Sequence, residues 1–588
     1  MKIGRKAVSL FWAAVVLAIV LLTWFGLAVA YPDIASVRYF PDRLFRLVKT
    51  VMGTDPLGSA LESPDVPWQL IVAKLLVTLV LIRGLMKIVG SVFRDNVTQL
   101  RVMFKKHPTV IVGAGRKGRR IAADLRERHH ESAVIIERAA GAGDAARVAP
   151  LRREGHLVIA GDATSQPVLK SAGAHRARRV ICFAQEQKTG IQVAGLVREL
   201  WSARGDLRGE TCDCHVHLDN PQLVDLFRSH VQAEMQPVRV HFFNLHKMVA
   251  RSLFERFPKE LAPALMNGAR RVRVDLIGFG QEAQAILVQG LRVLHLGLPD
   301  GVQWHVWVDA STAGKARQTL AARHPMADHI ADIRFHGSDA HYRALVDDAF
   351  ACPEDTLQIV ICAHPGDEDN ISAAAELLQA VPNARFPVFA RCADIDGLPA
   401  LLAGTQPRLR LFGNLADFCT VEMICGEQQD RIARAIHADY VGLAQGTASE
   451  SDAYKSGWAD LGEDARDANR AQADHIAYKL MAVQGDVTRI DGEVLEFLAM
   501  TEHQRWAAHR YLNGWRYGAE RDDERRTHPS LLPWFELSEA EREKDRDAVR
   551  RLPQLLGLSG RPAPAANPVP QTFEEEPPVG TSASNVQG

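Results

Sequence analysis

Hydrophobic positions divide the chain into regions of different pattern. Residues 7–30 contain no charged residue, and residues 68–92 carry only Lys74, Arg83 and Lys87. Short apolar runs of strand length, several of them followed by glycines, then recur between residues 109 and 440. From about residue 467 apolar residues return at helical spacing. This pattern predicts an α/β protein with two N-terminal transmembrane helices, tandem Rossmann-like parallel-sheet domains and an all-α C-terminal domain.

The two N-terminal apolar runs each have the length that a bilayer crossing needs, about 20 residues. Basic residues precede the first run at Lys2, Arg5 and Lys6, and others follow the second. The positive-inside rule then predicts a multi-pass protein of a bacterial inner membrane with both termini in the cytoplasm. Residues 28–30 imitate a signal-peptide cleavage site, but the length of the run and the second apolar run favour a retained anchor.

A glycine turn follows the first strand-like run. Residues 109–112 lead into Gly113-Ala-Gly-Arg-Lys-Gly118, a helix follows, and a second apolar run ends on Glu137. In a dinucleotide-binding turn the glycines permit the bend, the approach of a pyrophosphate and close helix packing, and the acid holds a ribose. In the alternative, the glycines only shape a turn in a ligand-free core. The candidate nucleotide contacts are Gly113, Gly115, Arg116, Gly118, Glu137 and Asp162. We expect Arg119 and Arg120 on a solvated face.

The same signal recurs about 165 residues later in a weaker form. Residues 274–277 lead into a turn from Gly278 to Ala283, and another strand-like run ends on Asp309. Alanine replaces the third glycine, and the acid lies farther along the chain. Two tandem copies of one domain explain this recurrence, and the second copy is expected mainly to pack against the first.

Further motifs in the first copy carry a family resemblance. Residues 161–164, 168–173 and 179–182 resemble the run that follows the ribose acid in RCK, or KTN, domains, the Trk-type modules of potassium channels and transporters. The resemblance covers roughly residues 107–245 and, more weakly, residues 270–435. It implies a six-stranded parallel sheet that binds NAD(H) or another adenine nucleotide, in a homo-oligomer (dimer or tetramer) that regulates ion transport. It implies regulation rather than hydride transfer, so we expect no enzyme activity; an NAD-dependent oxidoreductase is the alternative.

The segment between the two apolar runs contains a candidate pore. It resembles a potassium filter at Thr50, Val51 and Asp55 but departs from it at Met52, Gly53 and Thr54. Met52 and Thr54 would resist the backbone angles that a filter adopts at its glycines. Two alternatives stay open: a ligand-gated ion channel or potassium-transport regulator, and a membrane-tethered nucleotide sensor without a pore that acts in stress or phage defence.

The C-terminal region resembles the RyR domain, which was first named in ryanodine receptors. Residues 498–509, 513–518, 527–534 and 537–545 carry the resemblance, which covers roughly residues 455–556. Aromatic rings beside arginines and histidines can stack on a base and bind phosphate. The alternative is a helical core that satisfies its own polar groups. The candidate ligand contacts are Glu502, His503, Arg505, Trp515, Tyr517 and Arg521.

Composition and charge narrow the picture. The formal net charge is zero, so no nucleic-acid partner is indicated. All eight cysteines lie between Cys182 and Cys425 in the expected cytosolic part, which argues against disulfides. Alternation along a strand separates Cys212 and Cys214 from His215 and His217, so we expect no metal site there. The expected divisions are a membrane region (1–106), two Rossmann-like domains (107–265 and 266–440), the RyR domain (455–556) and a disordered tail (562–588).

Overall fold

The computed structural model divides the chain into two compact units, Met1–Phe104 and Lys105–Gly588. The candidate pore residues Thr50 to Asp55 and the C-terminal tail lie outside the residues that the structure describes. The described residues are 5–30, 45, 67–138, 142–183, 186–204, 210–220, 237–266, 268–337, 345, 353, 355–382, 386–394, 406–444, 457–458 and 461–559.

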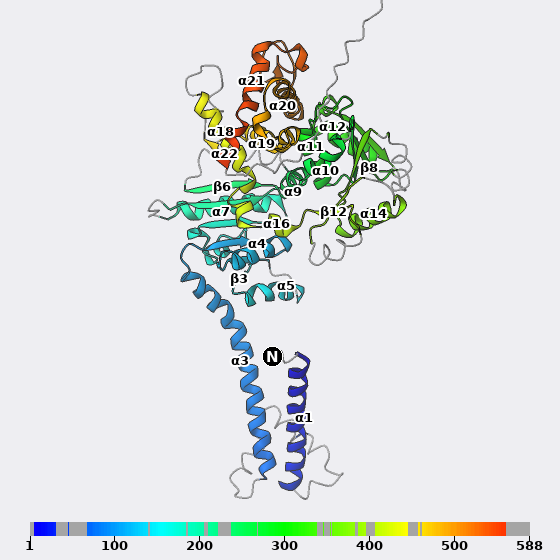
Figure 1. Cartoon of the computed structure of the whole chain (residues 1–588). Coiled ribbons are helices and arrows are strands. Elements are labelled where there is room, and N and C mark those ends of the chain that lie inside the picture. The colour runs from blue at the N-terminus through cyan, green and yellow to red at the C-terminus, as the bar shows by residue number, and fades with distance from the viewer. Residues whose placement is uncertain are drawn as a thin grey trace, which may run out of the picture. The chain divides into compact units, whose positions relative to one another are not determined.

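The first unit contains two antiparallel helices, α1 (Arg5–Ala30) and α3 (Trp68–Met103), which pack along each other (Figure 1). Small residues allow the close approach, because a Cβ added to Gly26 would lie 2.6 Å from the Leu70 side chain. At the other end of the pair, the Arg83 guanidinium lies 3.7 Å from the ring centroid of Trp12. Large apolar side chains on the outer faces of both helices are exposed, among them Leu17, Phe25, Leu75 and Leu79.

Within the part of the chain that the structure describes, no helix combines the length and the apolarity that a membrane crossing requires. This finding does not support the two transmembrane helices that the sequence predicts over residues 7–30 and 68–92. In α3 the apolar run is interrupted by Lys74, Arg83 and Lys87.

The second unit begins with a six-stranded sheet in which every strand is parallel to its neighbours, in the order β3-β2-β1-β4-β5-β6. The order reverses between β1 and β4, which creates a crevice at the carboxyl ends of these strands. All four residues of β1 and three of the four residues of β4 are buried, as expected for a sheet covered by helices on both faces. The elements are β1 (Thr109–Val112), α4 (Arg116–Glu127), β2 (Val134–Glu137), α5 (Ala142–Arg153), β3 (Leu157–Ala160), α6 (Gln166–Ser171), β4 (Arg179–Cys182), α7 (Gln187–Ser202), β5 (Cys212–His217), β6 (Val238–Phe243), α9 (Leu245–Phe254) and α10 (Phe257–Met266).

The second repeat has the same topology. Its sheet has the order β12-β11-β10-β7-β8-β9, again with parallel neighbours, so the two predicted Rossmann-like domains are confirmed. Three helices then lead toward the C-terminal domain. The elements are β7 (Arg271–Ile277), α11 (Gln281–Val293), β8 (Val302–Val308), α12 (Ala313–Arg323), β9 (Asp332–Gly337), β10 (Thr356–Cys362), α14 (Asp367–Ala380), β11 (Val388–Arg391), β12 (Leu409–Phe412), α16 (Leu415–Phe418), α17 (Val421–Ile424) and α18 (Arg431–Ala444).

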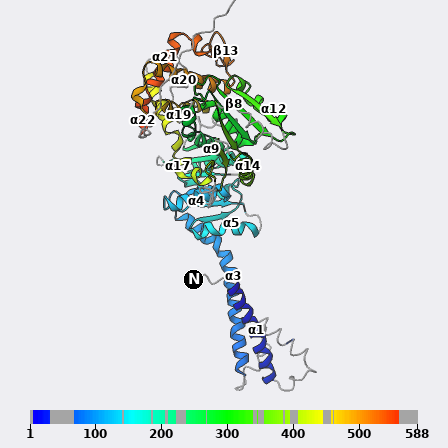
Figure 2. The same ribbon diagram turned by 45° about the vertical axis from the view of Figure 1, so that its right-hand side comes forward.

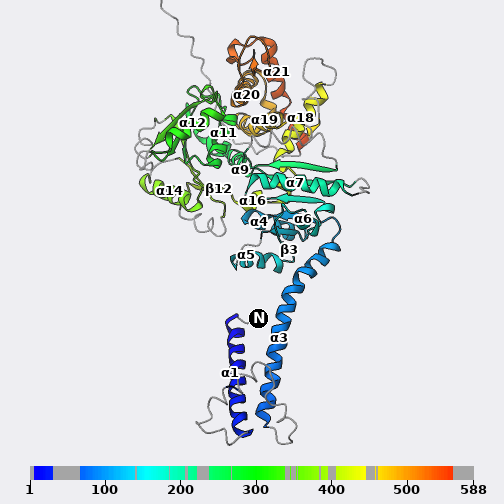
Figure 3. The ribbon, with the colours of Figure 1, turned by 180° about the vertical axis from the view of Figure 1, so that it is seen from behind.

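The C-terminal domain is mainly helical. Its elements are α19 (Glu463–Ala482), α20 (Gly492–Leu512), α21 (Glu539–Arg550) and α22 (Leu552–Ser559), with a short strand pair, β13 (Arg516–Tyr517) and β14 (Thr527–His528). Its helices gather at the end of the unit that lies away from α4 and α5 (Figure 2). Seen from behind, α19 lies between α11 of the second repeat and α18, and it contacts both (Figure 3).

One hydrophobic core runs through all three domains of the second unit. It includes Ile111 of the first sheet, Phe254 and Phe257 of the helices that follow it, Trp304 of the second sheet and Tyr478 of α19. The buried Tyr478 hydroxyl donates to the Phe254 carbonyl oxygen at 2.9 Å. Because burial of apolar area is the main stabilising term in folding, the repeats and the C-terminal domain hold one another in place.

Candidate functional site

The first glycine turn has the backbone that a dinucleotide turn requires. Gly113 follows β1 with φ of 97°, a region that disfavours side chains, and its N–H donates to the Ile136 carbonyl oxygen at 2.9 Å. A Cβ on Gly118 would lie 1.9 Å from the Gly113 carbonyl oxygen, so this position needs glycine. A Cβ on Gly115, the exposed N-cap of α4, would meet nothing within 4 Å. Gly115 therefore leaves open the space in front of the helix N-terminus, where a pyrophosphate binds.

Glu137 closes the turn from the adjacent strand. It ends β2, and its Oε2 accepts a hydrogen bond from the Ala114 N–H inside the glycine turn. The side chain is half-buried. A carboxylate at the end of the second strand, within reach of the turn, is placed to accept the hydroxyls of a ribose.

Asp162 and Arg116 flank the same crevice. Asp162 Oδ1 accepts from the Thr164 N–H at 2.9 Å and from its hydroxyl at 2.7 Å, and these bonds lower the pKa of the carboxyl. Its Oδ2 lies 3.2 Å from Arg138 Nη2. Arg116 is exposed at the first position of α4. The candidate nucleotide contacts thus come from one edge of the sheet.

The second glycine turn repeats the backbone without the ribose acid in place. Gly278 has φ of 97°, and Gly280 caps α11. Ala283 stands where the first turn has Gly118 and is fully buried. Asp309 is exposed beyond the end of β8. The turn packs as a structural element, as the sequence predicts.

A chain of polar contacts leads from the first turn into the interface between the repeats. Lys117, the second residue of α4, has its Nζ 3.3 Å from His217 Nε2, and His217 Nε2 lies 3.3 Å from Asp219 Oδ1. Burial, with the Lys117 ammonium beside it, lowers the pKa of His217 to about 3, so the imidazole is neutral near pH 7. Burial also lowers the pKa of Lys117.

The chain continues to the second turn. His246 lies 3.5 Å from Asp219 and 3.4 Å from Glu282, the second residue of α11. Arg391 Nε donates to Glu282 Oε2 at 2.9 Å, and the same guanidinium donates to Asp367. Burial would raise the pKa of Glu282, but His246 and Arg391 hold it below its usual value. The helices α4 and α11 begin at the two equivalent glycine turns. They carry opposite charges at equivalent positions, Lys117 and Glu282, and this chain of polar contacts connects the two residues.

These interface residues were not among the predicted site residues. Lys117 and Glu282 occupy equivalent positions in the two turns and carry opposite charges. An alignment of the two turns with each other would have revealed this complementarity. Arg120, which was expected on a solvated face, donates from Nη2 to Asp394 Oδ1 of the second repeat at 2.9 Å in a partly exposed ion pair. The repeats meet along this face of α4, so a basic residue there finds an acid.

The candidate ligand contacts of the C-terminal domain do not converge on one surface. Glu502, on α20, is buried between Lys479 and Arg505, and Arg505 Nη2 donates to Glu502 Oε1 at 2.8 Å. Burial would raise the pKa of Glu502, but these two cations hold it well below its usual value. His503 is bonded within the core, with Nε2 2.9 Å from the Leu532 carbonyl oxygen.

The three remaining candidates lie apart from this buried network. Trp515 is buried under Arg510, at 4.6 Å from guanidinium carbon to ring centroid. Tyr517 is 55% exposed, and Arg521 pairs with Asp523 at 3.1 Å on the surface. Glu502 and Arg505 are thus part of a buried helical core, in which Arg505 Nη1 has no hydrogen-bond partner among the described residues.

The histidine and cysteine cluster of β5 is also built into the core. Cys212 and Cys214 are buried free thiols, and burial raises the pKa of Cys212 to about 12. His215 stacks on His241 with ring centroids 4.7 Å apart. Among the described residues, Asp124, His129 and Glu422 form the one group with the spacing of metal ligands, but Asp124 Oδ2 already accepts the Val421 N–H at 2.9 Å.

Comparisons with known proteins agree with this domain content. Residues 109–209 match the TrkA-N domain family and residues 458–560 match the RyR domain family. Among solved structures, a GsuK mutant is 13% identical with a TM-score of 0.37, over 71% of this chain and 96% of that one. The GsuK channel bound to NAD is 12% identical with a TM-score of 0.39, over 73% and 85% of the two chains. No curated protein sequence matches the chain.

The buried position of Glu502 generates a stability prediction. Glu502→Gln removes the charge that compensates Lys479 and Arg505, and breaking a buried ion pair costs about 3–5 kcal/mol. We expect the melting temperature of the protein, followed by tryptophan fluorescence, to fall by several degrees. Tyr517→Ala, at an exposed position, should leave it unchanged. A Glu502→Gln protein that melts normally would contradict the structural role.

Proposed function

We propose that this chain is a nucleotide-regulated protein of the potassium-transport type, in which the first repeat binds NAD(H) or another adenine nucleotide. The observation that carries the proposal is the first glycine turn, with Gly113 at positive φ, open space at Gly115 and Glu137 within reach of the turn. The match of residues 109–209 to the TrkA-N domain supports the same assignment.

Binding would act on the contacts within the glycine turn. The hydroxyls of a ribose would donate to the Glu137 carboxylate and replace the hydrogen bond that it accepts from the Ala114 N–H. A pyrophosphate would lie at the N-terminus of α4. Lys117, on the first turn of α4, would then shift against His217 and the interface between the repeats. A ligand can bias the pairing of domains only through such contacts that differ between two states.

The proposal includes a membrane region and a homo-oligomer, a dimer or a tetramer. Its support is the uncharged run of residues 7–30 together with the large apolar side chains exposed on α1 and α3. Exposed apolar surface of this kind is normally covered by lipid or protein. The second unit would then lie in the cytoplasm and transmit the nucleotide signal to ion conduction through the oligomer.

A tethered nucleotide sensor without a pore is the second candidate function. Arg43, Arg46 and Lys49 favour it, because positive charge just before the candidate filter disfavours a cation. This sensor would have the same nucleotide site as the channel but would conduct no ions.

The nucleotide site is tested by alanine at matching positions of the two turns. Gly115→Ala places a methyl group where the pyrophosphate approaches, and no protein atom lies within 4 Å of it. We expect at least about tenfold weaker NAD or NADH binding in calorimetry, equal to about 1.4 kcal/mol, with little change in melting temperature. Gly280→Ala is the matched control in the second repeat, where the Cβ meets only Pro365 at 3.5 Å. Equal affinity in Gly115→Ala and the unmodified protein would contradict the assignment.

Ion conduction is tested by reconstitution of the purified protein in liposomes. Potassium and sodium flux is measured with and without NAD, NADH, ATP and ADP-ribose. The channel proposal predicts flux that responds to the nucleotide and that loses this response in Gly115→Ala. Intact nucleotide binding without flux would contradict the channel and leave the tethered sensor.

A further inference from the structure

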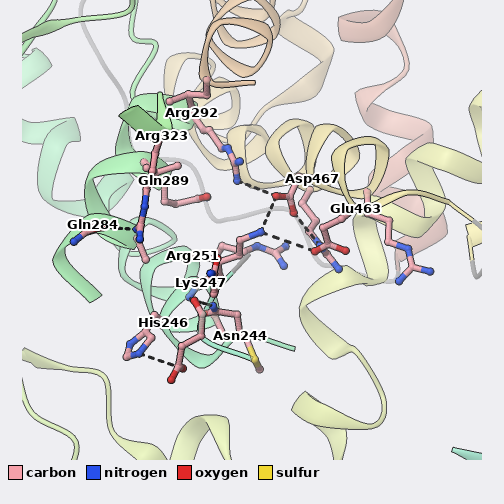
Figure 4. Close-up of a pocket in the computed structure, with 18 of the residues that line it drawn as sticks. Asn244, His246, Lys247, Arg251, Gln284, Gln289, Arg292, Arg323, Glu463 and Asp467 are labelled. Atoms are coloured by element: carbon pink, nitrogen blue, oxygen red, sulfur yellow. Dashed lines mark hydrogen bonds and ion pairs between the residues drawn. The ribbon is translucent and has the colours of Figure 1, made fainter. Parts of the chain in front are cut away.

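A cavity of about 620 Å³ lies where the two repeats and the C-terminal domain meet (Figure 4). The first repeat contributes the end of β6 and the start of α9, including Asn244 and Lys247. The second repeat contributes α11 and the end of α12, and the C-terminal domain contributes the start of α19 and the loop after α20. This volume falls in the range of small-molecule sites, about 300–1,000 Å³.

The cavity is separate from the predicted site residues, although Asp219 and His246 of the polar chain between the repeats line it. None of the candidate nucleotide contacts of the first turn lines it, from Gly113 to Asp162. None of the candidate ligand contacts of the C-terminal domain lines it either, from Glu502 to Arg521. A ligand here would touch all three domains at once.

One face of α11 forms a wall of mixed chemistry. Gln284, Val288, Gln289 and Arg292 follow one another at helical spacing and all line the cavity. Met248 and Phe279 add apolar surface nearby. Amide groups and apolar side chains together suit a nucleobase, which offers a flat apolar face and a hydrogen-bonding edge.

Three acidic groups of the lining are matched by cations. Asp467 accepts from Lys247 Nζ at 2.9 Å and from Arg470 Nη1 at 2.9 Å. Asp430 accepts from Arg251 at 2.7 Å, and Glu463 accepts from Arg470 at 2.6 Å. These carboxylates therefore do not attract a further cation.

Three arginines of the lining are less completely matched. Arg323 Nη1 donates to the Gln284 amide oxygen at 2.7 Å, and Arg526 Nη1 donates to the Asn513 carbonyl oxygen at 2.6 Å; both acceptors are neutral. Arg292 Nη1 lies 3.4 Å from Asp467, and its buried Nε has no hydrogen-bond partner among the described residues (Figure 4).

Arg526 and the neighbour of Arg323 both contact the end of α20. His324, next to Arg323, has Nδ1 2.8 Å from the Leu512 carbonyl oxygen, and Arg526 donates to the adjacent Asn513. A guanidinium group that donates only to neutral oxygens has a positive charge that no anion neutralises. Its planar set of N–H donors can form two parallel hydrogen bonds to a phosphate.

We propose that this cavity is a second ligand site, which takes a phosphorylated nucleoside with its phosphates at Arg292, Arg323 and Arg526 and its base against α11. Because all three domains contribute to the walls, occupancy stabilises their present arrangement. The site is independent of the glycine turn of the first repeat.

The test uses the full-length protein with Gly115→Ala, so that the first site contributes little. The nucleoside diphosphates of adenine, guanine, cytosine and uracil, and inorganic pyrophosphate, are titrated by calorimetry. We expect at least one nucleoside diphosphate to bind, and pyrophosphate to bind much more weakly. The double variant Arg323→Gln, Arg526→Gln should weaken nucleotide binding at least about tenfold, because two charge-assisted contacts are lost.

Arg317→Gln with Arg525→Gln is the matched control. Both of these arginines are exposed, lie on the same elements and do not line the cavity. The proposal is overturned if no nucleoside diphosphate binds, if pyrophosphate binds equally well, or if the two double variants behave alike. If instead the first glycine turn does not bind nucleotide, the result is different. The unmodified and Gly115→Ala proteins would then bind nucleotides with equal stoichiometry.

Discussion

A buried ion network around Arg251 and Arg470 holds the C-terminal domain to the repeats. Arg251, on α9 of the first repeat, donates to Asp430 at 2.7 Å and to Asp474 at 2.8 and 2.9 Å. Arg470, on α19, donates to the same Asp430 at 2.6 Å. Burial would raise the pKa of Asp430, but the two guanidinium groups hold it well below its usual value. Such a network fixes geometry more than it adds net stability, because desolvation offsets much of the attraction.

This constraint explains why the second unit is one body rather than three domains on linkers. Asp430 precedes α18 and follows the second repeat, so a single carboxylate connects the first repeat, the connecting segment and the C-terminal domain. The hydrophobic core continues beside it through Phe254 and Tyr478. Contacts from Lys117 to His217, from His217 to Asp219 and from Asp219 to His246 connect the α4 N-terminus with α9.

The features predicted correctly from the sequence are those that depend on residues close together in the chain. The turn at Gly113 and the acid at Glu137 follow from the strand, turn and helix order alone, and both repeats adopt the predicted parallel sheets. Helical spacing did not distinguish ligand contacts from core residues, because Glu502 and Arg505 form an ion pair at buried positions. Their partner Lys479 lies on another helix, and no local pattern connects the two.

The interface between the repeats was not predicted, for a related reason. Lys117 and Glu282 are brought together by docking of two domains about 165 residues apart, and each looks locally like an ordinary polar residue of a first helical turn. Arg120 was placed on a solvated face for the same reason. The cavity at Arg292 exists only once three separate domains have packed.

Nucleotide binding at the first turn should change contacts throughout the second unit. Amide hydrogen exchange of the full-length protein, with and without saturating NAD, tests it most directly. We expect slower amide exchange at α4, together with altered amide exchange in α9, α11 and α19. A change confined to β2 and α4 would contradict it.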